Sequence, residues 1–400
     1  MGTDRWRARG CPVCGLSQRD VLYHQHFLEP EGQHLLGEYL VCVCHGCGMA
    51  YADNIPAQEA FDSYYQARSK YEYPEREGEV PPHDLDRFKR VVEEIARLAP
   101  DRSQRILEVG ASTGAMLRAL RDHGYERLLG LDPSPECKAI ATRHGVLVEN
   151  LHPAVLAARG ETFGLVLLLA VLEHIRDLGS FLDVLVPVLA PGGALFVQVP
   201  DAAAFHAWPD APYQQFSTEH INYFSRTSLG NLLRLRGFEE EARWEYAVSG
   251  GQGCTLPVLD VLFRRTGVRS AVADLIRDQE TEPALKRYIT LSAETDAHLE
   301  KILAGVAHSG HEIIVWGVGT HTQRLLAEGR MAGLNIAAYV DSNSHLQGTT
   351  LGGKPILAPV ELKGRTEPIL ISSRASQEDI RLQILKTLGL RNEIITLYQL

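Results

Sequence analysis

The residues best suited to chemistry in this chain lie where an apolar strand runs into a glycine-rich turn. Residues 105–120 read as a strand, a tight turn with Gly110 and Gly114, and a helix with one apolar face. Glycine lets the backbone approach a ligand closely, and the new helix directs its free N–H groups at whatever lies over the turn. A second strand, at 127–131, ends at Asp132, where a carboxylate can accept hydrogen bonds from both hydroxyls of a ribose. The spacing predicts a nucleoside pocket at the carboxyl end of a parallel sheet.

The charge of this turn favours S-adenosylmethionine over a dinucleotide. A dinucleotide site needs G-x-G-x-x-G, because the pyrophosphate lies against bare backbone. This turn begins with Glu108, which would repel a pyrophosphate and attract a sulfonium and an amino group. The alternative is an ordinary strand–helix turn without a ligand. The residues expected to bind S-adenosylmethionine are Glu108, Gly110, Ala111, Ser112, Gly114, Asp132, Pro133, Asn150, Ala170 and Leu172.

Four cysteines near the start of the chain have the spacing of a structural zinc site. Cys11 and Cys14 form one C-x-x-C pair, Cys44 and Cys47 form another, and 29 residues separate the pairs. Each pair can place two thiolates on one tetrahedral ion, and the glycine after each pair lets the loop tighten. Four protein ligands leave no open position for catalysis, so we expect zinc to hold a small lobe together. A zinc ribbon that grips RNA is the alternative, which the acidic composition disfavours.

From residue 84 onward, helical and apolar segments alternate as in an α/β protein. The expected elements are a helix at 85–98, strands at 106–109 and 127–131, a helix at 135–144, and strands at 146–150, 165–170 and 194–199. This alternation predicts a doubly wound sheet. Strand-like runs at 238–248 and 254–264 predict a hairpin at its edge. Together with the acidic turn and Asp132, the pattern resembles class I S-adenosylmethionine-dependent methyltransferases, which implies their Rossmann-like fold.

A second group of chemical residues follows the fifth strand, in segment 213–225. Methyl transfer requires an aligned acceptor and removal of its proton, and the Glu219-His220 pair offers an imidazole with a suitable pKa. We expect His220 to be the general base, and Glu219 to orient it or to bind a substrate hydroxyl. His174, which follows the fourth strand, is a further candidate imidazole. The aromatic residues expected to shape the acceptor pocket are Tyr213, Phe216, Tyr223 and Phe224.

The alternative interpretation is that this segment is a loop that caps the following helix. In that reading Ser225 or Thr227 begins a helix at 228–236. The two readings are compatible, because a cap at Ser225 leaves His220 available for chemistry.

Taken in order, the two C-x-x-C pairs, the acidic glycine turn, Glu-His-x-x-Tyr-Phe-Ser and a further α/β domain resemble the zinc-containing sugar C-methyltransferase family. The resemblance covers nearly the whole chain. It implies a nucleotide-linked deoxysugar as the acceptor, with His220 removing a proton next to a 4-keto group and Glu219 in the active site. Ser217 departs from the family, whose better-known members have a tyrosine there that can support an enolate. The turn also reads Gly-Ala-Ser-Thr-Gly where theirs tends to read Gly-Ser-Asn-Asp-Gly, so O- or N-methylation stays open.

The last part of the chain repeats the organisation of the central domain. A strand–turn–helix lies at 313–326, and the next strand ends at Asp341. Gly317-x-Gly319 lacks the third glycine of a dinucleotide fingerprint, which disfavours NAD. Segment 341–357 is similar to the small Rossmann-like domain before some sugar acyltransferases, which implies a grip on the nucleotide part of the acceptor. The alternative is a structural or dimerising domain.

Composition narrows the class of protein. The 400 residues are 45% hydrophobic and carry a net charge of −10 without a basic block, which argues against a nucleic-acid partner. No apolar run reaches the roughly 20 residues of a membrane span, and the start of the chain lacks the apolar core of a signal peptide. An odd count of seven cysteines does not suggest a disulfide framework. We expect a cytoplasmic protein, a monomer or a homodimer, acting on a small molecule.

The sequence therefore predicts four parts. These are a zinc-binding lobe at 1–75, a methyltransferase domain at 76–267, a helical connector at 268–305 and a Rossmann-like domain at 306–400. The main hypothesis is a methyltransferase for a nucleotide-linked sugar. One alternative is an O- or N-methyltransferase of another small metabolite, and a different class is a zinc-ribbon binding protein whose methyltransferase core does not catalyse.

Overall fold

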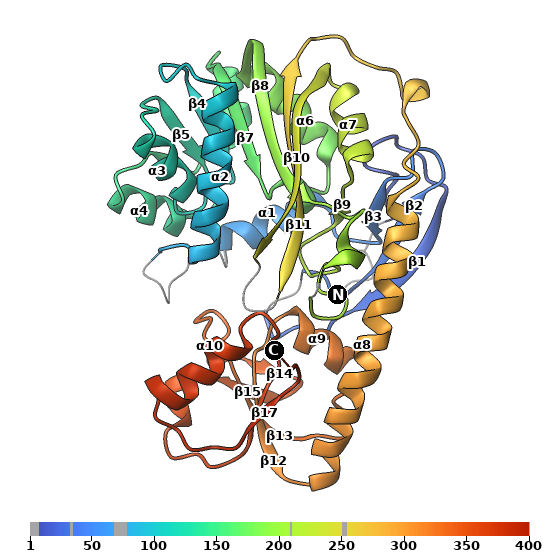
Figure 1. Cartoon of the computed structure of the whole chain (residues 1–400), viewed down its shortest axis with the longest axis vertical. Helices are drawn as coiled ribbons and strands as arrows, with labels where there is room; N and C mark the ends of the chain where they lie inside the picture. The colour runs from blue at the N-terminus through green and yellow to red at the C-terminus, as the bar shows by residue number, and fades with distance from the viewer. Residues whose placement is uncertain (1–7, 33–34, 68–77, 209, 250–253, 400) are drawn as a thin grey trace.

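A computed structural model describes residues 8–32, 35–67, 78–208, 210–249 and 254–399, which form three sheets with their helices (Figure 1). The long helix α8 runs along one side of the molecule and leads to the C-terminal domain. The predicted boundary at 75/76 and the turn at 250–253 lie outside the described residues.

The central sheet has seven strands in the order β10-β11-β8-β7-β4-β5-β6. Strands β4 to β8 are parallel and β10 and β11 form an antiparallel hairpin at the edge, so the predicted doubly wound sheet is confirmed. The strands are β4 Ile106–Val109, β5 Leu128–Leu131, β6 Val148–Glu149, β7 Phe163–Leu169, β8 Leu189–Pro200, β10 Phe238–Ser249 and β11 Thr255–Arg265. The helices are α2 Pro82–Leu98, α3 Ala115–Asp122, α4 Pro135–Arg143, α5 Pro153–Ala158, α6 Leu178–Leu185 and α7 Arg226–Arg234.

Strand β7 explains why this sheet is covered on both faces. Its apolar run sends Val166 and Leu168 into one core, which α5, α6 and α7 complete. Leu165 and Leu167 enter the opposite core, under α2 and α3. A strand without polar alternation must be buried on both sides, and β7 therefore lies in the middle of the sheet.

The N-terminal lobe is a four-stranded antiparallel sheet that borrows a strand from the methyltransferase segment. Its strands are β1 Arg19–His26, β2 Glu38–Cys44, β3 Ala50–Asp53 and β9 Asn222–Tyr223, and the helix α1 Gln58–Ala67 follows β3. Ala50 pairs with Tyr223 and Tyr51 with Asn222. The lobe is thus joined by a backbone ladder to the segment that carries the predicted base.

The connector is helical over only part of its predicted range. Helix α8 covers Thr281–Ser309, and residues 268–280 are irregular apart from one turn, η6 (Val272–Asp274). Asp278 fixes the start of α8, because its Oδ1 accepts hydrogen bonds from the backbone N–H of Glu280 and Thr281. The connector predicted at 268–305 is thus mostly helical, and its long helix begins at Thr281. No helix in the described part of the chain is both long and apolar enough to cross a membrane.

The C-terminal domain is a six-stranded sheet in the order β14-β15-β13-β12-β16-β17. All its pairs are parallel except β14 with β15. Its elements are β12 Glu312–Trp316, α9 Thr320–Ala327, β13 Asn335–Val340, β14 Thr350–Leu351, β15 Lys354–Leu357, β16 Ile369–Ile371, α10 Gln377–Leu382 and β17 Ile394–Thr396. This domain also contains the short helix η7 Pro359–Leu362 and the π-type η8 Gln383–Thr387, and the methyltransferase segment contains η3 Leu172–His174, η4 Val186–Val188 and η5 Phe205–Ala207.

A buried ion pair fastens this domain to the rest of the molecule. Both terminal nitrogens of Arg324, on α9, donate to the Asp296 carboxylate on α8 at 2.7 Å, and both side chains are 1% exposed. The guanidinium also lies over the ring of Tyr213, 4.9 Å from its centroid. The segment that contains Tyr213 therefore rests on α9.

Removing one partner from this pair should destabilise the protein. Asp296→Asn removes the carboxylate that both terminal nitrogens of the buried Arg324 contact and leaves only Glu328 as its counter-charge, which should cost about 3 kcal/mol of unfolding free energy. Glu300→Gln is the matched control, because Glu300 pairs with Arg330 at the surface of the same helix and is 53% exposed. Denaturant unfolding measures both variants, and equal losses would contradict the prediction.

Candidate functional site

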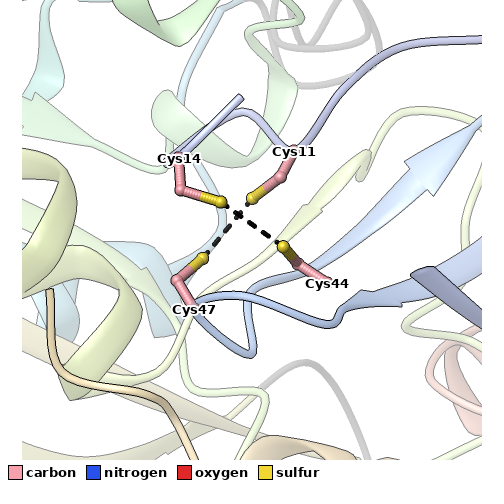
Figure 2. Close-up of side chains that lie close together, drawn as sticks. All are labelled: Cys11, Cys14, Cys44 and Cys47. Atoms are coloured by element: carbon pink, nitrogen blue, oxygen red, sulfur yellow. Dashed lines mark hydrogen bonds between the residues drawn. The ribbon is translucent and has the colours of Figure 1, made fainter. Parts of the chain in front are cut away.

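The four predicted zinc ligands meet at one point (Figure 2). All their sulfur atoms lie within 4.8 Å of one another, with Cys11 3.5 Å from Cys47 and Cys14 3.4 Å from Cys44. A tetrahedral zinc ion with bonds of about 2.3 Å would hold its sulfurs about 3.8 Å apart. The donor set and its spacing therefore fit zinc, and Cys42 is not part of the cluster.

Glycines shape both cysteine turns. The backbone N–H of Gly15 donates to the Cys11 carbonyl at 2.8 Å, and that of Gly48 to the Cys44 carbonyl at 3.1 Å. Gly15 has φ +78° and Gly48 has φ +77°. A Cβ at Gly48 would stand 2.2 Å from the carbonyl oxygen of Asp278, so only glycine fits between this turn and the segment before α8.

Arg9, two residues before Cys11, links the N-terminal lobe to the segments that carry Arg176 and Ile221. Its Nη1 donates to the Arg176 carbonyl at 2.8 Å, and its Nη2 donates to the Ile221 carbonyl at 2.7 Å and to Asn222 Oδ1 at 2.9 Å. Burial lowers its pKa to about 10. Sequence reasoning missed Arg9, because an isolated arginine carries no motif that shows its distant partners.

Glu108 is a buried carboxylate at the carboxyl end of β4. It is 3% exposed, and its Oε2 has no hydrogen-bond partner among the described residues. Burial, and next the Asp132 carboxylate, hold its pKa well above the usual range, against an opposing effect of Arg87. A cationic ligand would relieve this cost, so the group suits the positive end of S-adenosylmethionine.

The turn after Glu108 has the geometry of a close backbone approach. Asp132 accepts hydrogen bonds from the backbone N–H of Ser112 at 2.8 Å and of Ser134 at 2.9 Å. Ser112 has φ +48°, a left-handed conformation that a serine seldom adopts. Gly110 has φ +78°, and a Cβ there would stand 2.7 Å from a methyl group of Val171. Such strain is typical of ligand sites, and the turn fits a nucleoside.

The remaining predicted cofactor residues surround this turn. Asn150 donates from Nδ2 to the carbonyls of Asp132 and Ser134 at 2.9 and 2.8 Å, so it holds the Asp132 loop. Its direct contact with the cofactor stays a prediction. Ala170 follows β7 with φ +55°, at the point where the ligand crevice of such a sheet opens. Ala111 and Leu172 are buried, and Pro133 is exposed.

Residues 172–175 and 219–222 are clamped together at the end of β7. Asn222 Nδ2 donates to the carbonyls of Leu172 and Ile175 at 2.8 and 2.7 Å. The backbone N–H of Ile221 donates to the carbonyl of Glu173 at 2.8 Å. This clamp brings together two segments that are far apart in the sequence.

The clamp places the two candidate imidazoles against each other. The rings of His174 and His220 are 4.9 Å apart between centroids, at 71°. His174 is 6% exposed, and its Nδ1 lies 3.0 Å from both the Tyr65 hydroxyl and the Glu219 carbonyl. His220 is the more accessible of the two, as a proton acceptor for a substrate must be.

Two tyrosines of α1 enter the site, which the sequence did not reveal. The Tyr64 hydroxyl donates to Glu219 Oε1 at 3.2 Å, and Tyr65 contacts His174. Ser217, at the position of the family tyrosine, accepts hydrogen bonds through Oγ from the backbone N–H of Glu219 and His220 at 3.3 and 3.1 Å. The serine therefore shapes the Glu-His turn, and α1 supplies the phenols.

His220 lies on the wall of a cavity of about 470 Å³ between the methyltransferase and C-terminal domains. Its own domain contributes polar residues such as Gln214, Ser217 and Thr218. The opposite wall belongs to the C-terminal domain and includes Gly317, Gly319, Thr320, His321, Asp341 and Arg374. An acceptor in this cavity would touch both domains.

The four aromatic residues predicted to line the acceptor pocket do not line this cavity. Phe216 and Tyr223 pack with Tyr39 and Tyr288 in the core of the N-terminal lobe, and Phe224 is in the methyltransferase core. Tyr213 is 5% exposed and stacks on Tyr23 at 4.5 Å. The prediction of a substrate wall was wrong, because the neighbouring lobe and α8 bury the large side chains and leave polar ones at the cavity. Ser225 caps α7 as predicted, with its Oγ accepting from Ser228 N–H.

Loss of the Glu108 charge should weaken cofactor binding. Glu108→Gln removes a charge-assisted contact, and the dissociation constant for S-adenosylmethionine should rise about 10- to 100-fold in calorimetry. Because the pKa of the free carboxyl is raised, wild-type affinity should increase as pH rises through that pKa, and the variant should lose this dependence. Glu149→Gln is the control, because Glu149 lies on β6 and its side chain pairs with Lys138 on α4, away from Glu108. Equal effects of the two variants would contradict the assignment.

Loss of one thiolate should release the metal. Cys14→Ser should lower bound zinc, measured by elemental analysis, and reduce thermal stability, because three thiolates close the site poorly. Cys42→Ser, a buried cysteine outside the cluster, should retain the metal. A stable, metal-free and fully active Cys14→Ser protein would refute the structural role.

Comparisons with known proteins agree with this geometry. A methyltransferase-domain family matches residues 83–242, and a family described as C2185-like, N-terminal matches residues 309–396. The C-methyltransferase NovU of Streptomyces niveus is 26% identical over 276 residues, which cover 65% of this chain and 63% of NovU. A ubiquinone biosynthesis O-methyltransferase of Rhizobium etli is 34% identical over 99 residues, 23% of this chain and 40% of that protein. The chain thus spans less than two thirds of these curated relatives.

Among solved structures, the N-methyltransferase NodS from Bradyrhizobium japonicum WM9, in complex with S-adenosyl-L-homocysteine, aligns with 52% of this chain and 97% of NodS. The identity is 16% and the TM-score 0.38, too low to support an inference. The strand order, the acidic glycine turn and the match over residues 83–242 show that this chain contains a class I S-adenosylmethionine-dependent methyltransferase domain.

Proposed function

We propose that this protein transfers the methyl group of S-adenosylmethionine to a nucleotide-linked deoxysugar, with His220 as the general base. The observation that carries the proposal is the cavity on which His220 lies, since its far wall is a second Rossmann-like domain. A sugar beside His220 would have its nucleotide within reach of that domain. Proton removal at a carbon next to a 4-keto group is the chemistry that the sugar C-methyltransferase resemblance implies.

The C-terminal wall has groups that suit a nucleoside diphosphate. Gly317 has φ +107° and precedes the N-terminus of α9, whose free N–H groups favour phosphate. Arg374 adds a guanidinium to the same cavity. Asp341 accepts a hydrogen bond from the backbone N–H of Val318 at 2.8 Å, as Asp132 does from Ser112, and can take a ribose in the same way.

The cofactor would bind on the other side of His220. Glu108 would face its positive charge, Gly110 would allow close approach, and Asp132 would accept from its ribose. When bound, S-adenosylmethionine supplies an electrophilic methyl group on a sulfonium. His220 would take the acceptor's proton, and Glu219, held by the Tyr64 hydroxyl, would orient the base or bind a sugar hydroxyl.

Carbon methylation is supported by the phenols of α1. An enolate next to a 4-keto group gains from a nearby hydroxyl donor, and Tyr64 and Tyr65 lie at Glu219 and His174. This supply offsets the loss of a tyrosine at Ser217. The 26% identity with a C-methyltransferase favours the same reading.

O-methylation of another small metabolite is the second candidate. It is favoured by the 34% identity with an O-methyltransferase, although over only 99 residues. A binding protein without catalysis is disfavoured, because the uncompensated Glu108 carboxylate costs stability unless a cation uses it.

A panel assay tests the function. The protein is incubated with S-adenosylmethionine carrying a ¹³C-labelled methyl group and with nucleoside-diphosphate sugars, including 4-keto deoxysugars. NMR then locates the label. A new C–CH₃ signal on the sugar supports the proposal, and an O–CH₃ signal supports the sugar acceptor but contradicts methylation at carbon. Cofactor binding without transfer to any sugar would contradict the proposal and leave the second candidate, another metabolite.

Removing the base should stop turnover without affecting the cofactor. His220→Gln should lower the rate of methyl transfer about 10²- to 10⁴-fold, while calorimetry finds the S-adenosylmethionine dissociation constant unchanged, since His220 acts on the acceptor. His308→Gln, on the exposed end of α8, is the control. A His220 variant with full activity would refute the assignment.

A further inference from the structure

Glu173 is a buried carboxylate beside the predicted base, and neither the cofactor turn nor the cavity wall uses it. It is 1% exposed and lies on η3, directly after β7. A carboxylate oxygen of Glu173 and ring nitrogens of His174 and His220 all lie within 4.8 Å of one another. The backbone of the same residue accepts the N–H of Ile221, so its position relative to His220 is fixed.

The two imidazoles in this group differ in their surroundings. His174 is enclosed, with Nδ1 next to the Tyr65 hydroxyl and the Glu219 carbonyl. His220 lies on the cavity. A proton taken from an acceptor would therefore arrive on His220, and the resulting positive charge would lie next to the Glu173 carboxylate.

The energetics favour the charged imidazole at this place. Next to the Glu173 carboxylate, an imidazolium gains a Coulombic attraction that the neutral imidazole lacks, and burial strengthens this attraction. The pair is thus most stable in the state that follows proton removal. The same attraction would fix the orientation of the ring before the reaction.

We propose that Glu173 is the positioning residue of His220, orienting its ring and stabilising the imidazolium formed during methyl transfer. The inference rests on the proposed function. A proton passes from the acceptor atom to a ring nitrogen of His220, that atom takes the methyl group from sulfur, and neutral S-adenosylhomocysteine leaves. The imidazolium then gives its proton to water in the cavity, and Glu173 stays ionised throughout.

Other charged or titratable groups also face His220. They are His174 on η3, Glu219 on its own segment, Tyr64 and Tyr65 on α1, and Asp210, His321, Asp341 and Arg374 around the cavity. The Glu219 carboxylate already accepts from the Tyr64 hydroxyl.

Two groups on the cavity are less able to act on His220. Asp210 accepts from Ala211 N–H and Gln215 Nε2, both at 2.7 Å, and burial raises its pKa to about 6. Burial lowers the pKa of His321 to about 3, so it is neutral near pH 7. Glu173 remains the carboxylate best placed to act on the base.

The test compares Glu173→Gln with wild type by NMR of ¹³C-labelled histidine rings, with the His220 signal identified by its absence in His220→Gln. The midpoint of the His220 titration should fall by about one pH unit or more in the variant. Methyl transfer should slow about 10²-fold, with the acidic limb of its pH profile moved to lower pH and the S-adenosylmethionine dissociation constant unchanged.

Glu219→Gln is the matched control and should move the His220 midpoint less. Circular dichroism and zinc content verify folding, and if Glu173→Gln is unfolded, Glu173→Asp serves instead and should move the midpoint in the same direction by less. An unchanged midpoint in the folded variant overturns the inference and leaves the proposed function standing. Metal binding by Glu173, His174 and His220, seen as loss of activity on chelation with the cysteine site still loaded, would also overturn it. Full activity of His220→Gln would instead refute the proposed function.

Discussion

The placement of the predicted base depends on one set of hydrogen bonds around Asn222. Its side-chain N–H groups donate to the carbonyls at both ends of η3, and its Oδ1 accepts a hydrogen bond from Arg9 of the N-terminal lobe. The Asn222 and Arg9 side chains are buried, so leaving one of their polar groups unpaired would cost about 1–3 kcal/mol. Asp53 and the Ala52 carbonyl hold Arg9 within the N-terminal lobe, Arg9 holds the backbone at 221–222, and that backbone directly follows the Glu-His pair. In this structure the N-terminal lobe therefore contributes to the placement of the predicted base.

Charge determines what the two sides of the site can bind. The cofactor turn leaves the Glu108 carboxylate uncompensated in the described structure, and the cavity wall of the C-terminal domain carries a helix N-terminus and Arg374. One side therefore suits a cation and the other an anion. His220 lies between these two sides of the site. A sulfonium donor and a phosphate-bearing acceptor satisfy both, and neither requirement follows from the fold alone.

Sequence reasoning was successful where the signal is local. Apolar periodicity and turn glycines predicted the central sheet, and C-x-x-C spacing predicted the thiol cluster, because both follow from neighbouring residues. It failed where distant segments decide. Tyr213 and Phe216 read as a substrate wall, yet β1 and α8 bury them. Arg9, Tyr64 and Tyr65 reach partners more than 100 residues away, and no spacing rule encodes such contacts.

The most direct test of this account is a crystal structure with S-adenosylhomocysteine and a nucleoside-diphosphate sugar bound together. The account predicts adenosine against the turn at 110–114 with its ribose on Asp132, the diphosphate at the N-terminus of α9, and the sugar ring in contact with His220. A nucleotide bound outside the cavity between the two domains, or a sugar ring separated from His220 by protein, would contradict it.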